Sequence, residues 1–464
     1  MIHTIRFNDA LRLAAEGARD PALPAQWPVR IVRDIFGRLR FAVDAYRPSL
    51  VTGAMNEDRD AVPPDQIYPA DAHRRLVAAT ARLGRYATAP DALFRDDFAN
   101  PDSLFKSADW HELVLPEFAD ADGVMHAELA FNLLDRQIVG QDWLHTHARQ
   151  RAEGDPPRVV FYGLKGGVGR TTALAMIAYN LAREGRRVLL LDFDLESPGL
   201  SALLIPADRV AGYGLVDWFI EDAIYHDDTV LNDLVSDSPL AENTGGRIRV
   251  ASAIGQGETA YLAKLARVYS DVPTRNGPER FAQRMGRLVK TLEEREKPDI
   301  VLIDSRAGLH DLAAISIATL ADLALLFATD SEQTWSGYRQ LFTHWQQRPA
   351  VLRGVRERLW LVRAMFPETD RKERFDRFLE HAYDLFSEQL YDAIDPSETE
   401  SGDTFSFDMD SESAPHFPLI VNFSARFMEF DPLLPESHGG VGEGEIDLAF
   451  GAFTRRVKSL LFGE

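Results

Sequence analysis

The stretch 162-YGLKGGVGRTTALA-175 decides the fold of this chain. The residues from Gly163 to Thr171 read G-L-K-G-G-V-G-R-T and resemble the phosphate-binding spacing G-x-x-x-x-G-K-[ST]. Glycines let backbone N–H groups point at an anion, and the first turn of the following helix adds partial positive charge. Because an apolar run precedes the loop and a helical pattern follows it, the stretch predicts a strand, a phosphate loop and a helix.

The loop departs from that spacing in its cations. Arg170 stands where the rule has lysine, and Lys165 supplies a second cation earlier in the loop. Arginine keeps the charge and adds a planar fork of donors, but it does not replace lysine in every geometry. Thr171 is placed to bind Mg²⁺. The residues predicted to hold a nucleotide are Gly163, Lys165, Gly166, Gly167, Val168, Gly169, Arg170, Thr171 and Thr172.

From Arg158 onward, strand and helix patterns alternate along the chain. The apolar runs are continuous, which is typical of strands covered on both faces in a parallel sheet. The fold predicted for this part is therefore α/β, with a mostly parallel, doubly wound P-loop NTPase sheet and helices on both faces. Strands are expected over 158–163, 186–194, 247–253, 299–304, 321–329 and 358–366 and within 416–427, and helices over 170–185 and 446–463.

A domain boundary is expected at 150-QRAEGDPPR-158, because this polar stretch with Gly and two prolines suits neither helix nor strand. It divides the chain into residues 1–152 and 153–464. The N-terminal part is expected to be a smaller, mixed α+β domain that binds a partner or acts as an effector module, since it shows no catalytic constellation. Its expected elements are a hairpin over 30–44 that turns at Phe36-Gly37, a helix over 72–87 and a loop-rich segment over 88–123.

The composition argues against several classes of protein. The chain of 464 residues has no cysteine, which excludes disulfides and thiolate metal sites and predicts a cytoplasmic protein. Its formal net charge of −21 argues against DNA and anionic membranes as partners, because Lys and Arg supply most of that affinity. No apolar run approaches the ~18 residues of a membrane span. The segment 394–415 carries acids without Lys or Arg and is expected to be a solvated, acidic loop.

Two further stretches place acids at the ends of predicted strands. The stretch 189-LLLDFDLESPGL-200 carries Asp192 and Asp194, which are two residues apart and therefore on the same side of a strand. The stretch 298-PDIVLIDSRAGLHD-311 carries Asp304 at the end of another apolar run. An acid at a strand end can also simply cap the following turn, so the order of all three stretches matters.

In this order, the three stretches resemble the deviant Walker A P-loop ATPases of the ParA/MinD-like family, over roughly residues 158–345. The resemblance implies ATP and Mg²⁺ as ligands and a homodimer that sandwiches two nucleotides. It implies that Lys165 reaches the partner's nucleotide and neutralises charge in the transition state. It also implies that Asp192 and Asp304 hold the Mg²⁺ water shell beside Thr171.

The same resemblance assigns the chemical step. It implies that Asp194 orients the attacking water, so the candidate catalytic residues are Lys165, Asp194 and Arg170. Arg170 in place of the late lysine implies that hydrolysis is slow or, in the alternative, lost. The residues placed where the γ-phosphate would be sensed are Ser305, Ala307 and Gly308.

One feature of the family is missing. Many relatives carry an Asn at the end of a later strand, where it reads the adenine, but the predicted strand 358–366 carries Arg363 and no Asn. Asn422 is one candidate substitute, and it is equally a polar residue on an edge strand. Since no guanine motif Asn/Thr-Lys-x-Asp is found, the resemblance favours ATP.

The sequence favours an ATP-dependent, dimerising switch ATPase that hydrolyses ATP·Mg²⁺ slowly to control association with a protein partner through residues 1–152. One alternative is a non-hydrolysing, nucleotide-bound scaffold of a bacterial signalling or defence system, marked by Arg170. Another is a partition-type ATPase that binds DNA, which would need a basic surface. A bacterial tyrosine kinase would carry a tyrosine-rich tail, whereas the last tyrosine here is Tyr391.

Overall fold

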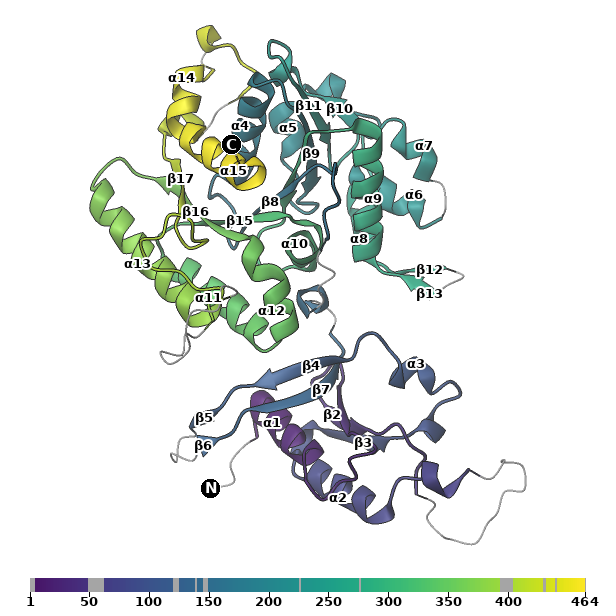
Figure 1. Cartoon of the computed structure of the whole chain (residues 1–464). Helices are drawn as coiled ribbons and strands as arrows, with labels where there is room; N and C mark the ends of the chain where they lie inside the picture. The colour runs from purple at the N-terminus through teal and green to yellow at the C-terminus, as the bar shows by residue number, and fades with distance from the viewer. Residues whose placement is uncertain are drawn as a thin grey trace. The chain divides into compact units, whose positions relative to one another are not determined.

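The chain separates into two compact units, Met1–Gln141 with Gln346–Pro349, and Asp142–Trp345 with Ala350–Glu464. The sequence-based boundary between residues 152 and 153 lies C-terminal to this division. Figure 1 shows the elements of both units. The computed structural model describes residues 5–48, 62–119, 125–137, 140–144, 149–224, 227–274, 277–392, 404–428, 431–438 and 440–463.

The second unit is built on one large sheet, which has eight strands among the described residues. All neighbouring strands are parallel except the pair at one edge, β10 with β11, which is antiparallel. Continuous apolar runs such as RVVFYG form these strands because both of their faces are buried. In spatial order, the strands are β10 (Val235–Asp237), β11 (Arg247–Ala251), β9 (Arg187–Phe193), β14 (Ile300–Ser305), β8 (Arg158–Gly163), β15 (Leu323–Ala328), β16 (Leu359–Phe366) and β17 (Leu419–Asn422).

Helices cover both faces of this sheet, so it is doubly wound. On β8, Val159 and Phe161 belong to one apolar core, and Val160 and Tyr162 belong to the other. The first core is completed by α4 (Arg170–Arg183), α5 (Leu200–Leu204), α14 (Glu443–Ile446) and α15 (Ala452–Phe462). The second is completed by α6 (Leu215–Asp222), α7 (Asp227–Leu231), α8 (Tyr261–Val268), α9 (Phe281–Glu296), α10 (Asp311–Ile315), α11 (Glu332–Gln346), α12 (Pro349–Val355) and α13 (Arg371–Gln389).

The sequence predictions for this unit are confirmed in the type and order of the elements, but not in every boundary. Each predicted strand overlaps an observed one, with ends that differ by a few residues, and the predicted helix 170–185 is α4. The closing helix 446–463 is helical, with a π-helical turn over Asp447–Gly451 before α15. The antiparallel edge strand β10 and the small hairpin of β12 (Val272–Thr274) and β13 (Gly277–Glu279) were not predicted.

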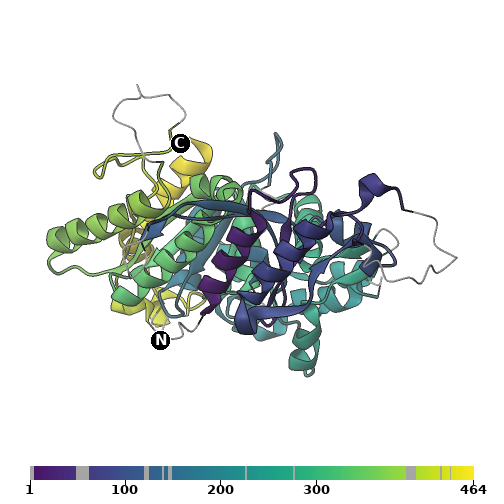
Figure 2. The same cartoon turned by 90° about the horizontal axis from the view of Figure 1, so that it is seen from below.

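The first unit holds a smaller, mixed sheet with two helices, α1 and α2, on one face and the short α3 on the other. The β1–β2 and β4–β7 pairs are antiparallel, and the β1–β7 and β2–β3 pairs are parallel. Helices α1 and α2 lie side by side, as Figure 2 also shows, and bury residues such as Leu11 and Leu76 against Phe41. The elements are α1 (Phe7–Ala18), β1 (Arg30–Arg33), β2 (Leu39–Ala42), α2 (Ala70–Ala81), β3 (Ala87–Leu93), α3 (Asp102–Phe105), β4 (His111–Leu115), β5 (Phe118–Ala119), β6 (Met125–His126) and β7 (Leu129–Asp135).

Of the three predictions for this unit, one is confirmed and two need correction. The hairpin over 30–44 is confirmed, with Gly37 at a φ of +81° in its turn. The predicted helix 72–87 is wrong at its end, because α2 stops at Ala81 and β3 begins at Ala87. The segment 88–123 is also less loop-rich than predicted, since it contains most of β3 and all of β4. Both are edge strands with half-exposed residues, so their apolar pattern is weak.

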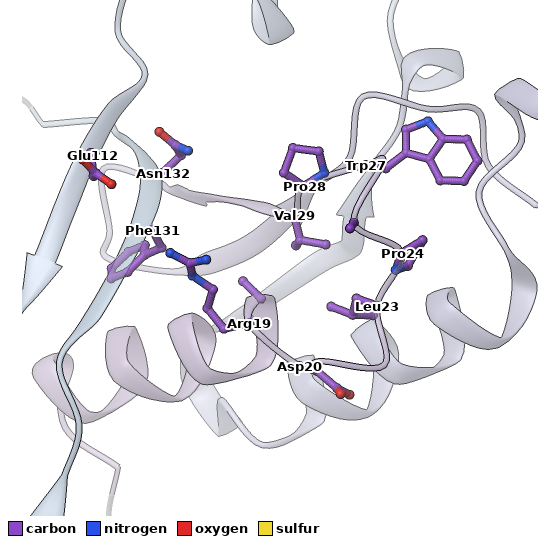
Figure 3. A pocket seen from close by; sticks show the side chains of 12 residues that line it. Arg19, Asp20, Leu23, Pro24, Trp27, Pro28, Val29, Glu112, Phe131 and Asn132 are labelled. Carbon is purple, nitrogen blue, oxygen red and sulfur yellow. The ribbon is translucent and has the colours of Figure 1, made fainter.

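The first unit also contains a cavity of about 320 Å³ (Figure 3). Its lining combines the apolar side chains of Trp27 and Phe131 with polar ones such as Arg19 and Asn132. The Arg19 Nε donates a 2.7 Å hydrogen bond to the carbonyl of Ala130.

The acidic segment 394–415 is packed where the structure describes it. Its residues 394–403 lie outside the described residues. Phe405 lies 5.5 Å from the ring of Tyr391 and under the guanidinium of Arg356 at 4.7 Å, and Ala414 is fully buried. The prediction of a loop holds for residues 404–415, which form no helix or strand and expose Asp408 and Asp410, but Phe405 and Ala414 are packed rather than solvated.

No helix in the described parts of the chain is both long and apolar enough to cross a membrane.

Candidate functional site

The three stretches singled out in the sequence meet at the carboxyl edge of the large sheet. In the sheet, β9 and β14 lie on one side of β8, and β15 lies on the other side. The strand order therefore reverses at β8. In open α/β sheets, ligands bind where the strand order reverses in this way. The loop after β8 and the segments after β9 and β14 all begin at this position (Figure 1).

The loop between β8 and α4 uses its glycines for backbone geometry. Gly167 and Gly169 have φ values of +74° and +78°, which L side chains rarely adopt. A Cβ on Gly163 would lie 3.3 Å from Cγ2 of Val168, so this glycine allows the chain to pass closely. Counting back from Arg170, the first glycine of the G-x-x-x-x-G spacing falls on Leu164, which is one residue later than Gly163.

Arg170, the first residue of α4, is buried between two carboxylates. Its Nε donates to Oδ1 of Asp304 at 2.7 Å, and its Nη2 donates to Oδ2 of Asp194 at 2.8 Å. Burial favours the neutral form, but the two carboxylates outweigh it and raise the pKa of the guanidinium. The positive charge of Arg170 is therefore fixed at the centre of an acidic site.

Asp192 and Asp304 are direct neighbours on the adjacent parallel strands β9 and β14. Both are almost fully buried. Burial raises the pKa of Asp192 well above its usual range, and the charge of Asp304 raises it further. Oδ2 of Asp304 accepts a 2.7 Å hydrogen bond from the Thr171 hydroxyl, and Oδ2 of Asp192 accepts one from the Leu200 amide at 3.2 Å.

Asp194 follows the end of β9 and faces the same arginine. Burial raises the pKa of its carboxyl, and the charge of Arg170 only partly offsets this effect. We call Arg170, Asp192, Asp194 and Asp304 the Arg170 cluster. It brings one permanent cation together with three carboxylates, two of which have a raised pKa. Perturbed groups of this kind gather at functional sites more often than elsewhere.

Three buried polar atoms at this site have no hydrogen-bond partner among the described residues: Nη1 of Arg170, Oδ1 of Asp192 and Oγ of Ser305. Buried polar groups are normally paired, so such atoms call for a ligand or water. A donor, a carboxylate oxygen and a hydroxyl suit a phosphate and a hard cation.

The residues present also fit Mg²⁺ in number. Within the described ranges, no group of three or more His, Asp or Glu side chains is arranged to hold a metal ion. Mg²⁺ typically uses one or two carboxylates and keeps several waters beside the phosphates of its nucleotide. Asp192, Asp304 and the Thr171 hydroxyl form a small oxygen set of that kind.

The remaining predicted residues take different places. Lys165 is half-buried in the loop and has no hydrogen-bond or ion-pair partner in the described structure. Gly166 and Gly167 are exposed, whereas Val168 is buried and packs in the core beneath α4. Thr172 lies half-buried on the first turn of α4. The loop amides and Lys165 are therefore accessible, while Arg170 is not.

The segment after β14 is tied to the phosphate loop through the backbone. The Gly308 amide donates to the carbonyl of Gly163 at 3.0 Å, and the Tyr162 hydroxyl donates to the carbonyl of Gly308 at 3.1 Å. Gly308 has a φ of +82°, so a side chain would be strained there. These bonds hold the segment after β14 against the start of the phosphate loop.

Two charged residues near this site were missed in the sequence. Glu196, two residues after Asp194, forms an ion pair with Arg306, two residues after Asp304, at 2.5 Å. Both stand inside the stretches that carry the predicted acids. The opposite charges at equal distances from two strand ends were a signal that could have been read.

The strand that lacks the expected Asn ends irregularly. Arg363 of β16 is buried, its Nη1 donates to the carbonyl of Ala364 at 2.7 Å, and burial lowers the pKa of its guanidinium. Met365 has a φ of +51°, and a Cβ on Gly169 of the phosphate loop would lie 3.9 Å from its Cγ. The side chain of Asn422, at the end of the edge strand β17, is already paired. It donates to the carbonyl of Leu448 at 2.8 Å and accepts from Arg371 at 3.0 Å.

Comparison with known protein families picks out the same segment of the chain. Residues 159–320 match the family described as "CbiA: CobQ/CobB/MinD/ParA nucleotide binding domain". This segment runs from β8 through the end of the π-helical turn before β15, so it includes the loop and both acidic strand ends. No curated protein matches the chain.

Among solved structures, the chain is similar to a ParA family ATPase from Chlorobium tepidum, with 15% identity and a TM-score of 0.40 over 64% of this chain and 98% of that one. It is also similar to the MinD cell division protein of Aquifex aeolicus, with 15% identity and a TM-score of 0.40 over 65% and 97%. A complex of a Cyanothece McdA variant with ATP gives 15% identity and a TM-score of 0.40 over 66% and 96%.

Proposed function

We propose that this chain is an ATP-dependent switch that binds ATP with Mg²⁺, dimerises on it and hydrolyses it slowly to control association with a partner protein. The observation that carries the proposal is the Arg170 cluster, whose buried, unpaired atoms lie at the strand-order reversal beside a glycine-rich loop. The family match over residues 159–320 supports nucleotide binding by the same segment.

The residues of the site divide the work in this proposal. The amides of Gly166, Gly167 and Gly169 and the first turn of α4 bind the phosphates. Bound Mg²⁺ would be held by Thr171, Asp192 and Asp304 and would neutralise charge on the phosphate oxygens. Nη1 of Arg170 is the spare donor of a guanidinium that otherwise holds the carboxylates in place.

Asp194 and Lys165 carry the chemical step in this proposal. Asp194 orients the attacking water, which is mostly a matter of position in phosphoryl transfer. Lys165 has no partner in its own described chain, which suits a cation that reaches the nucleotide of a second copy. Each site would then be complete only in the dimer.

The test is to size the protein with no nucleotide, with ADP·Mg²⁺ and with ATP·Mg²⁺, and to measure ATP affinity and phosphate release on the same samples. We expect association with ATP only. Lys165→Ala should reduce hydrolysis more than affinity, because the lysine acts across the interface. If Lys165→Ala abolishes ATP binding while the wild type stays monomeric with ATP, the dimeric switch is rejected.

A non-hydrolysing scaffold is the second candidate, and the position of Arg170 favours it. The guanidinium binds Asp194 and Asp304 directly, so the carboxylate assigned to water is already engaged. ATP binding and association without phosphate release would support the scaffold. A partition-type ATPase that binds DNA is the third candidate, and the net charge of −21 argues against it.

The first unit is proposed as the site of the protein partner, in a cytoplasmic protein. A fragment of residues 142–464 should then bind ATP in the absence of the first unit. A fragment of residues 153–464 should be less stable, because it lacks Trp143, whose ring lies 6.3 Å from that of Tyr162 and 5.8 Å from that of Trp345. Loss of ATP binding in both fragments would show that the first unit is part of the ATPase.

A further inference from the structure

Three side chains converge on the carboxylate of Glu196, which lies beside the Arg170 cluster. Glu196 lies in the segment after β9 and pairs with Arg306 of the segment after β14, with 2.5 Å between Oε2 and Nη1. The Tyr269 hydroxyl, just after α8, donates to Oε1 of Glu196. His310 approaches the same oxygen with its Nε2 at 3.6 Å.

The tautomer of His310 is set by its surroundings. Its Nδ1 accepts a 3.2 Å hydrogen bond from the Leu312 amide at the start of α10, so the ring proton of neutral His310 is on Nε2 and faces Glu196. Burial lowers the pKa of this histidine, which keeps it neutral. The negative charge of Glu196 is therefore balanced by Arg306 rather than by His310.

The segment after β9 is also held from the side of α8. The Tyr261 hydroxyl, in the first turn of α8, donates a 2.5 Å hydrogen bond to the carbonyl of Leu195. The Ser197 amide closes a turn on the carbonyl of Asp194 at 3.0 Å. Asp194 thus sits at the start of a turn whose next two residues, Leu195 and Glu196, are both fixed.

Arg306 is connected to Asp194 through Glu196. Glu196 lies two residues after Asp194, in the turn that the Ser197 amide closes on the carbonyl of Asp194, and its carboxylate pairs with the Arg306 guanidinium. Gly308, two residues further on, is hydrogen-bonded to Gly163 of the phosphate loop. The Glu196–Arg306 pair therefore links the segment that follows Asp194 to the segment whose Gly308 is hydrogen-bonded to the phosphate loop.

We infer that Arg306 is a positioning residue for the proposed hydrolysis, and that Glu196 holds it there. The Glu196–Arg306 pair ties the segment that carries Asp194 to the segment that reaches the phosphate loop. This inference rests on the proposed function, and it assigns a role to two residues outside the phosphate-loop and acidic pattern. The pair has half-buried side chains, at 21% and 27% exposure, so its value as a plain surface ion pair would be small.

The experiment uses the full chain and compares Glu196→Gln, Arg306→Ala and the double variant with a matched control, Glu296→Gln. Glu296 pairs with Arg249 at 2.8 Å and is similarly exposed, at 17%, but it lies at the end of α9. The readouts are ATP affinity, the single-turnover rate of hydrolysis and the thermal midpoint of unfolding.

We expect Glu196→Gln and Arg306→Ala to slow hydrolysis by about tenfold or more, because a small displacement of a positioned group has this effect. ATP affinity should stay within about threefold, since neither residue holds the nucleotide. The double variant should be no slower than Arg306→Ala, because the two residues act as one unit. Arg306→Lys should restore part of the rate, since it keeps the charge.

A purely structural pair gives a different pattern. The thermal midpoint would then fall by similar amounts in Glu196→Gln and Glu296→Gln, and both would hydrolyse ATP at the wild-type rate, which overturns the inference alone. A wild type that binds ATP but releases no phosphate overturns the inference together with the hydrolytic part of the proposed function. A wild type that binds no ATP rejects the whole proposed function, so the failures are distinguishable.

Discussion

A buried group of arginine and carboxylate side chains lies at each end of β8. The two groups differ in whether all their buried polar atoms are paired among the described residues. At the amino end, Arg158 binds Glu293 of α9 with two hydrogen bonds of 2.6 Å, and neither residue leaves a buried atom unpaired. We call these residues the Arg158 pair. At the carboxyl end, the Arg170 cluster is equally buried, yet Nη1 of Arg170 and Oδ1 of Asp192 have no partner in the described structure.

The difference separates a structural role from a functional one. A buried ion pair that satisfies itself contributes to folding or specificity, and it offers nothing to a ligand. A buried cluster with spare donors and acceptors remains costly until something binds it. The position agrees with this reading, because ligands of open α/β sheets bind at the carboxyl ends of the strands.

The largest expected effect is on the Arg158 pair. Glu293→Ala leaves the Arg158 guanidinium buried without its partner, and breaking such a pair costs about 3–5 kcal/mol of unfolding free energy. Urea unfolding without nucleotide measures this loss. ATP affinity of the folded protein should stay unchanged, because the pair lies at the opposite end of β8.

Glu242→Ala is the control for that measurement. It breaks the ion pair of Glu242 with Arg209, in which both side chains are more than half exposed, and should cost at most about 1 kcal/mol. If both variants lose the same stability, or if Glu293→Ala weakens ATP binding, the two ends of β8 do not differ in the way we describe.

The next effect concerns the Arg170 cluster. Asp194→Ala should slow single-turnover hydrolysis by ~10²-fold or more, the scale of a positioning or proton-accepting group, and it should trap an ATP-loaded dimer. ATP affinity should be retained, because the loop amides and Thr171 bind the nucleotide. Asp194→Asn separates the two roles of the residue, since it keeps an acceptor for Arg170 but removes the charge.

Both Asp194 variants should be slow if the carboxylate orients water. A rate equal to wild type would move that role to Asp192 or Asp304. A collapse of ATP affinity in both variants would instead make Asp194 a structural or Mg²⁺-shell residue, and the water-orienting role would be dropped.

The third effect is stabilisation by the ligand. At 100 times its dissociation constant, ATP·Mg²⁺ should raise the unfolding free energy by about 2.7 kcal/mol. Glu293→Ala should show the full increase, because its site is intact, whereas Thr171→Ala should lose the part that depends on Mg²⁺. Thermal unfolding with ATP, with and without Mg²⁺, measures both. Equal increases in Thr171→Ala and wild type would remove Thr171 from the metal site.

The sequence predicts the carboxyl end of β8 far better than the amino end. The glycines, the cations and the threonines of the loop are consecutive, so local backbone rules place them together. Arg158 and Glu293 are separated by 135 positions, and only the packing of α9 on the sheet brings them into contact. For the same reason, the engagement of Arg170 by Asp194 and Asp304 was not predicted.

The first unit shows the other limit of the sequence. The β1–β2 hairpin follows from apolar runs around Gly37, but β3 contains Pro90 and Asp91 and was read as a loop. An edge strand tolerates proline where a central strand does not, because one side of it needs no partner. Strand position in the sheet, which decides this, is not visible in a single strand's sequence.

The last effect, at most about 1.4 kcal/mol per pH unit, is a pH dependence near the segment that follows the carboxyl end of β14. Burial raises the pKa of Asp142 to about 7, Asp311 of α10 and Asp271 raise it, and Arg280 lowers it. Because this folded value exceeds the unfolded one of 3.8, the folded protein binds more protons between those values. The contribution of Asp142 to stability is therefore most favourable below the unfolded value and is lost as pH rises toward about 7.

Asp142→Asn isolates this contribution, because asparagine stays neutral at every pH. The difference in unfolding free energy, wild type minus Asp142→Asn, should fall with rising pH by at most about 1.4 kcal/mol per unit and become constant above pH ~7. Urea unfolding of both proteins from pH 5 to 8 measures it, and titrations common to both cancel. The Arg158 pair should contribute nothing to that slope. When Asp142→Asn is added to Glu293→Ala, the unfolding free energy should therefore change at each pH by the same amount as when Asp142→Asn is added to the wild type. A difference independent of pH would place Asp142 in water, and a difference that grows with pH would mean that a cation, rather than burial and Asp311, controls this carboxyl.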